Sequence, residues 1–118
     1  MFKKRKPYLI AEVGSNHLGR EKLSKKSIVL AKKAGADCVK FQLFNENNLV
    51  NSRLKVYKHV SDKKLKYQYQ RFKKVKISIN QVKIFSKLAK KHKIDFCVTP
   101  FDHSYVKKIK NYVSFFKV

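Results

Sequence analysis

The stretch that decides the fold is "GADCVKFQLF", residues 35–44. It is an apolar run typical of a β-strand, yet it contains Lys40 and Gln42 two residues apart. Side chains alternate between the two faces of a strand, so Lys40 and Gln42 share one face. The opposite face is apolar, with Val39, Phe41 and Leu43. A strand that presents an ammonium group and an amide on one face predicts a ligand on that side.

Three further short apolar runs predict strands, which gives strands over residues 8–13, 37–43, 94–99 and 115–118. Each run has one apolar face that can pack against helices. Each opposite face becomes polar or charged toward the carboxyl end of the strand. The residues at those positions are Glu12, Lys40, Gln42, Thr99 and Lys117.

Helical patterns separate the predicted strands. Apolar and small residues recur at helical spacing, and Gly35 follows as a stop signal. The members of this stripe are Leu23, Ser27, Leu30, Ala31 and Ala34. "SINQ" (residues 78–81) has the form of a capping box before a second stripe. The members of that stripe are Val82, Phe85, Leu88 and Ala89. Asp102 is predicted to be the N-cap of a third helix. Alternating strands and helices favour βαβ units and a parallel sheet.

The polar strand faces distinguish two parallel α/β architectures. Strands of an open sheet covered on both sides are apolar on both faces, whereas the interior of a TIM barrel is polar at its C-terminal mouth. The sequence has no glycine-rich nucleotide fingerprint. We therefore expect the N-terminal half of a TIM barrel, with residues 1–118 as one partial domain of four strands and three helices. Residues 45–76 form a long connection, expected to be a functional loop or a mobile segment with one short helix near Tyr67.

Each polar strand residue also has a structural interpretation. Glu12 alone fits a paired structural carboxylate, Lys40 fits a side chain that extends past the strand end, and Thr99 fits a position before a turn at Pro100. Taken together, two lysines, an amide, a hydroxyl and a carboxylate at one mouth favour a site for an anionic, oxygen-rich ligand.

The net charge of +23 admits two interpretations. One is an electrostatic surface for nucleic acid. The other is a solvated, lysine-rich surface that reflects coding bias. Only four of the 30 basic residues are arginine, the type that bidentate phosphate binding and base readout prefer. We therefore favour the second interpretation and expect no specific nucleic acid partner.

The cysteines, the histidines and the hydropathy of the chain do not indicate a further functional site. Cys38 and Cys97 have no zinc-type spacing and are expected to be buried thiols. His17, in "GSNHLG", is expected to shape the loop after the first strand, and the other histidines (His59, His92 and His103) are expected at the surface. No run is long enough for a membrane span, and a cytoplasmic location is expected.

Three motifs carry a resemblance to a known family. "IAEVGSNHLG" (10–19), "AKKAGADCVKFQLF" (31–44) and "VTPFD" (98–102) resemble, in order and spacing, the N-terminal part of the sialic acid (N-acetylneuraminate) synthases. The resemblance implies a transferase that condenses phosphoenolpyruvate with an N-acetylated amino sugar such as N-acetylmannosamine. The product would be a nonulosonic acid of carbohydrate biosynthesis. It further implies a divalent metal ion, manganese or magnesium, whose ligands are not in this chain, and a homodimer at full length.

The same resemblance implies roles for single residues. Lys40, Thr99 and Lys117 resemble phosphoenolpyruvate ligands, Gln42 resembles the amino-sugar contact, and Glu12 resembles the essential carboxylate. A complete barrel needs about 250 residues. We therefore expect a fragment of a synthase. The alternatives are a decayed or split product that needs a complementing chain, and a standalone basic half-barrel that binds polyanions or nucleic acid.

Overall fold

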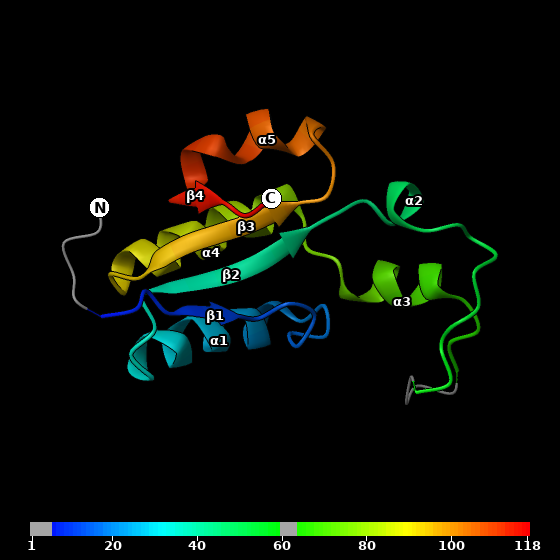
Figure 1. Cartoon of the computed structure of the whole chain (residues 1–118), viewed down its shortest axis with the longest axis horizontal. Helices are drawn as coiled ribbons and strands as arrows, with labels where there is room; N and C mark the ends of the chain where they lie inside the picture. Colours follow the sequence, from blue (N-terminus) through cyan, green and yellow to red (C-terminus); the bar gives the residue numbers. More distant parts are fainter. Residues whose placement is uncertain (1–5, 60–63) are drawn as a thin grey trace.

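A computed structural model describes residues 6–59 and 64–118 of the chain (Figure 1). In chain order the elements are β1 (Ile10–Glu12), α1 (Glu21–Lys33), β2 (Cys38–Leu43), α2 (Glu46–Leu49), α3 (Gln68–Val75), α4 (Ile79–Lys91), β3 (Asp95–Pro100), α5 (Ser104–Ile109), a 3₁₀ turn (Lys110–Tyr112) and β4 (Phe115–Phe116). All four predicted strands are therefore present, with ends that differ from the prediction by up to two residues.

The four strands form one parallel sheet in the order β1-β2-β3-β4. Each strand pairs with the next one in the sequence, and each connection contains a helix. This is the order of consecutive strands in a (β/α) barrel, as predicted, and not the reversed order of a doubly wound sheet. The carboxyl ends of β2 and β3 point toward the side where α2 and α3 lie (Figure 1).

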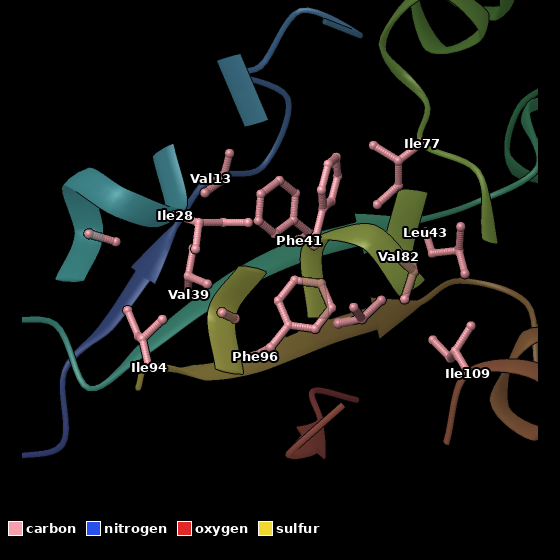
Figure 2. Packing of buried hydrophobic residues seen from close by; sticks show 14 residues of the cluster. Val13, Ile28, Val39, Phe41, Leu43, Ile77, Val82, Ile94, Phe96 and Ile109 are labelled. Atoms are coloured by element: carbon pink, nitrogen blue, oxygen red, sulfur yellow. The ribbon is translucent and has the colours of Figure 1, made fainter. Parts of the chain in front are cut away.

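The hydrophobic core lies between the sheet and the helices (Figure 2). Phe41 is completely buried at its centre, with its ring centroid 5.2 Å from that of Phe85 on α4 and 5.8 Å from that of Phe96 on β3. Ile28 on α1 and Ile109 on α5 are also fully buried. The helices thus cover the apolar strand face identified in the sequence, and the polar face is directed away from them.

The helix caps and apolar helix faces predicted from the sequence are mostly confirmed by the structure. Ser78 and Gln81 form the predicted capping box of α4, with hydrogen bonds of 3.1 and 2.9 Å. Two details were wrong. Leu30, assigned to the apolar stripe of α1, is 49% exposed, and Ile28 is buried instead. The N-cap of α5 is His103, and Asp102 acts one residue earlier by accepting a hydrogen bond from the Ser104 amide.

The long connection between β2 and α4 holds more structure than predicted. It contains both α2 and α3, and an isolated antiparallel bridge joins Lys55 to Tyr67. The ring of Phe44, at the end of β2, packs edge-on against Phe72 of α3 at 5.5 Å. Residues 60–63 lie outside the described residues. Aromatic packing therefore holds α3 close to the carboxyl end of β2.

The amino ends of the strands are joined by polar contacts. The Asp37 carboxylate accepts a hydrogen bond from the Leu9 amide, and Asp95 accepts from the hydroxyls of Tyr8 and Ser114. Cys38, at this end, and Cys97, which lies beside Lys40 in the register between β2 and β3, are free, fully buried thiols, as predicted. Burial raises the pKa of Cys38 to about 12 and also raises that of Cys97. Polar contacts therefore hold the amino end of the sheet together, and both thiols stay protonated.

Candidate active site

Glu12, Lys40 and Thr99 meet at the carboxyl end of the sheet. Glu12 pairs with Lys40 in the register between β1 and β2, so both side chains leave the sheet on the same face. The Lys40 ammonium forms an ion pair with Glu12 Oε2 and donates a hydrogen bond to Thr99 Oγ1 at 3.4 Å. Three neighbouring strands thus contribute one connected polar cluster.

Burial within this cluster is uneven. The Lys40 side chain is only 11% exposed, whereas that of Glu12 is 47% exposed. A buried ammonium group requires a partner, and Lys40 has a carboxylate on one side and a hydroxyl on the other. Lys40 therefore does not extend past the strand end into solvent. It is a fixed positive charge on the polar face of the sheet.

Gln42 and Lys117 extend the same row of side chains. Gln42 lies beside Thr99 in the register between β2 and β3 and is half-buried. Lys117 follows β4, and its backbone amide donates to the Val98 carbonyl at 3.2 Å. Its side chain is exposed. The structure therefore brings Glu12, Lys40 and Thr99 into direct contact, with Gln42 adjacent and Lys117 on the next strand.

The turn after β1 supports Glu12 from the backbone side. The Gly14 amide donates a hydrogen bond to Glu12 Oε1 at 3.0 Å, so each carboxylate oxygen has a partner. His17, expected to shape this turn, is 2% exposed, and its Nδ1 accepts from the Gly19 amide at 3.0 Å. The Gly14 amide was not predicted as part of the site, although the glycine two residues after the carboxylate was its visible signal.

Gly19 brings this turn against the end of α3. Its φ angle is +70°, and a Cβ atom there would lie 2.0 Å from the Lys74 carbonyl oxygen. Gly35 has a φ angle of +85° but open space around it. The β1–α1 turn and the long connection are therefore in backbone contact at a point that only glycine allows.

Gly19→Ala is expected to destabilise the protein far more than the matched control Gly35→Ala. The left-handed backbone alone costs roughly 1–2 kcal/mol for alanine, so we expect that loss at Gly35 and at least about twice that loss at Gly19. Urea denaturation of both variants measures the difference. Equal losses would show that the approach to Lys74 is not tight in solution.

A second set of contacts joins the loops above the sheet. Asn48, on α2, donates to Asp102 Oδ2 at 2.8 Å, and Asp102 Oδ1 accepts from the Ser104 amide at 2.8 Å. Hydrogen bonds from Ser104 and Asn48 lower the pKa of Asp102 from 3.8 to about 2. Asp102 follows Thr99 by three residues, so these bonds connect the end of β3 to the segment after β2.

Glu46 and Lys76 connect the same segment to α4. Glu46 is 3% exposed and accepts from the Lys76 ammonium at 2.8 and 2.9 Å. Burial alone would raise the pKa of Glu46, but the hydrogen bonds and charge of Lys76 outweigh it, so the pKa is lowered. This pair was not predicted, because the two residues are 30 positions apart in the sequence.

Asp102→Asn is expected to destabilise the protein at neutral pH, by an amount that becomes smaller as the pH is lowered. Because the folded pKa of about 2 lies below the ordinary 3.8, Asp102 contributes its stabilisation above pH 3.8 and loses it as the pH falls toward 2. The difference in unfolding free energy between the wild type and Asp102→Asn should therefore shrink over that range. Asn48→Ala, which removes one hydrogen bond, should show a smaller effect. A constant difference between pH 5 and pH 2 would contradict this explanation.

The described residues offer no ligand set for the divalent metal ion that the family resemblance implies. Among residues 6–59 and 64–118, no group of three or more histidine, cysteine, aspartate or glutamate side chains is arranged to hold a metal ion. In the same part of the chain, no helix is long and apolar enough to cross a membrane. The polar face of the sheet thus supplies positive charge, a carboxylate and hydrogen-bonding groups, but no metal centre.

Comparison with known proteins shows the family of the chain. The sequence model of the NeuB family matches residues 27–118 of this chain. The chain belongs to the NeuB family. The N,N'-diacetyllegionaminic acid synthase of Legionella pneumophila is 36% identical over 97 residues, which cover 80% of this chain and 27% of that enzyme. The enzyme of the same name from Campylobacter jejuni is 37% identical over 100 residues, which cover 83% of this chain and 30% of that enzyme.

A solved structure confirms the fold prediction. The N-acetylneuraminic acid (sialic acid) synthetase of Leptospira borgpetersenii, solved in complex with citrate, superposes with a TM-score of 0.76 at 25% identity. The match covers 94% of this chain and 35% of that enzyme. The chain is thus similar to the first part of a TIM-barrel synthase, and it spans 27 to 35% of the length of these three relatives.

Proposed function

We propose that the chain forms the phosphoenolpyruvate-binding part of a nonulosonic acid synthase. The observation that carries the proposal is the cluster of Glu12, Lys40 and Thr99 at the carboxyl ends of three parallel strands in a NeuB-family chain. In a TIM barrel this position is the catalytic mouth. The cluster combines a buried ammonium group with a hydroxyl donor, which suits the phosphate and carboxylate groups of phosphoenolpyruvate.

Each residue has a distinct role in the proposed reaction. Lys40 and Lys117 neutralise the charge of phosphoenolpyruvate, and Thr99 donates a hydrogen bond to one of its oxygens. Gln42, beside Thr99, orients the N-acetylated amino sugar by its amide. The C3 carbon of phosphoenolpyruvate then bonds to the aldehyde carbon of the open-chain sugar, water adds at C2, and phosphate leaves.

Glu12 is the proposed carboxylate that engages the attacking water. Its Oε1 is held by the Gly14 amide and its Oε2 by Lys40, so its orientation is set before the substrates bind. The metal ion that acts on the aldehyde in this family would be bound by residues outside this chain. The remaining barrel strands, part of the substrate pocket and any dimer contact would also come from outside it.

The experiment that tests the proposal is turnover. The assay supplies phosphoenolpyruvate, N-acetylmannosamine and manganese, and it follows phosphate release and nonulosonic acid formation. We expect no turnover by the 118-residue chain alone, and turnover when the remaining barrel strands are supplied by a longer protein or a complementing chain. In that active protein, Glu12→Gln should abolish turnover and Glu21→Gln, on the outer helix α1, should not. Equal activity of both variants would contradict the proposed role of Glu12.

A further inference from the structure

The helices that cover the sheet carry an unbalanced charge. Together α1, α4 and α5 contain eleven lysines, no arginine and one acidic residue, Glu21. Glu21 already forms an ion pair of 2.6 Å with Lys25 on the same helix. The other acidic residues that the structure describes lie outside these helices; they are Glu12, Asp37, Glu46, Asp95 and Asp102. The outer helix layer is therefore cationic, with almost no acidic side chain to neutralise it.

Packing of the helices on the sheet directs these lysines toward solvent. The buried residues of α1 are Ser24, Ile28 and Ala31, and those of α4 are Val82, Phe85, Ser86 and Ala89. α1 contacts β2 and α4 contacts β3, so these buried faces are turned to the sheet. The lysines on the opposite faces are exposed; they are Lys22, Lys26, Lys32 and Lys33 on α1, Lys87, Lys90 and Lys91 on α4, and Lys107 and Lys108 on α5.

The lysines of α1 and α4 lie on neighbouring helices. The two helices contact each other, and Lys32 Nζ of α1 donates a hydrogen bond of 2.7 Å to the Lys93 carbonyl just after α4. The carboxyl-terminal ends of both helices therefore meet. Like charges one helical turn apart repel each other, and neighbouring helices lie about 8–10 Å apart. A bound polyanion would relieve this repulsion along both helices at once. We call the exposed lysines of α1 and α4 the lysine surface.

The chemistry of the lysine surface restricts the kind of polyanion. Lysine presents a point charge that suits a phosphate group, whereas base readout favours the planar fork of arginine, which these helices lack. A helix that binds a lipid bilayer needs an exposed apolar face. In α1, α4 and α5 the only large apolar side chain that is exposed is Leu30, at 49%. These features favour a linear phosphate backbone over a bilayer.

We propose that the lysine surface of α1 and α4 binds the phosphate backbone of a nucleic acid without sequence preference. The driving force is the release of counterions from the phosphates that the lysines neutralise. The helices cover the apolar face of the sheet, whereas Glu12 and Lys40 lie on the other face. The lysine surface and the candidate active site are therefore separate, and this inference does not rest on phosphoenolpyruvate binding.

Two variants of the 118-residue chain that each remove four positive charges test the proposal. The first replaces lysines of the lysine surface by glutamine, in Lys26→Gln, Lys33→Gln, Lys87→Gln and Lys91→Gln. The matched control makes the same change at exposed basic residues of the long connection, in Arg53→Gln, Lys55→Gln, Lys58→Gln and Lys66→Gln. Fluorescence anisotropy of a labelled DNA duplex of about 20 base pairs, at salt concentrations from about 50 to 200 mM, gives the affinity and its salt dependence.

The first variant is expected to bind the duplex at least about tenfold more weakly than the wild type at 50 mM salt. Each lost phosphate contact lowers the slope of log K against log salt by about 0.9, so this slope should fall by roughly 3 to 4. The control variant should change the slope by less than half as much. Lys40→Met should leave duplex binding unchanged, and duplexes of unrelated sequence should bind equally well.

Three results would overturn the proposal. Equal weakening by the two variants would mean that only the net charge matters. A first variant with an unchanged slope would place the contacts elsewhere, and tighter binding to anionic phosphatidylserine vesicles than to DNA, at equal phosphate concentration, would identify a bilayer as the partner. Circular dichroism verifies that each variant is folded. If the fourfold variant does not fold, the double variant of Lys87→Gln and Lys91→Gln takes its place, with an expected fall in slope of about 2.

Discussion

Phe41→Ala is expected to destabilise the protein by about 3–5 kcal/mol, the usual range for removal of a fully buried aromatic ring. Phe41 is 0% exposed and contacts the rings of Phe85, Phe96 and His17. Removal of its ring would leave a cavity where the sheet, α4 and the β1–α1 turn meet. Because domains have only about 5–15 kcal/mol of stability, the variant should be largely unfolded in mild urea.

Phe101→Ala is the matched control for this prediction. The Phe101 side chain is 52% exposed and contacts Phe44 edge-on at 6.2 Å. We expect a loss of roughly 0.5–1.5 kcal/mol, the contribution of one such aromatic contact. Urea denaturation followed by circular dichroism gives both values. If Phe41→Ala costs no more than Phe101→Ala, Phe41 is not the centre of the core.

The second large effect is expected on ligand binding, from Lys40→Met. Methionine keeps most of the length of the side chain but removes its charge and its hydrogen bonds. Loss of one partner of a buried charged interaction costs about 2–5 kcal/mol, so phosphoenolpyruvate should bind at least about 30-fold more weakly. A titration followed by the ³¹P resonance of phosphoenolpyruvate measures the affinity.

Lys87→Met is the control for the effect of the overall positive charge on phosphoenolpyruvate binding. Lys87 is exposed on the outer helix α4, and its loss lowers the net charge by the same amount. A chain with a net charge of +23 attracts any small anion, so only the difference between the two variants is informative. Equal weakening by both substitutions would mean that phosphoenolpyruvate binds to the surface charge and not to the strand face.

Strand and helix positions were predictable because local patterns set them. The alternation in residues 35–44 assigned Lys40 and Gln42 to one face and Phe41 to the other, and the structure places them so. The capping box at Ser78 was visible for the same reason. Leu30 was misassigned because the stripe of α1 admits two rotations about the helix axis, and only the packing of Ile28 decides between them.

The contacts that were not predictable join residues far apart in the sequence. Asn48 with Asp102 and Glu46 with Lys76 are separated by 54 and 30 positions, and no periodicity links them. The helix α3 was also only partly visible, because its stability comes from packing of Phe72 on Phe44. The approach of Gly19 to Lys74 likewise required the tertiary structure, although a glycine in a turn is a common signal.

The measurement that tests the central claim most directly is a ¹H–¹⁵N NMR titration of the chain with phosphoenolpyruvate, with inorganic sulfate as the reference anion. The predicted result is a saturable set of shifts at the carboxyl ends of the four strands, around Glu12, Lys40, Thr99 and Lys117, that sulfate reproduces only weakly. Lys40→Met should remove these shifts. Shifts spread over the lysines of α1, α4 and α5, equal for both anions and abolished by salt, would contradict the claim that this face of the sheet is a phosphoenolpyruvate site.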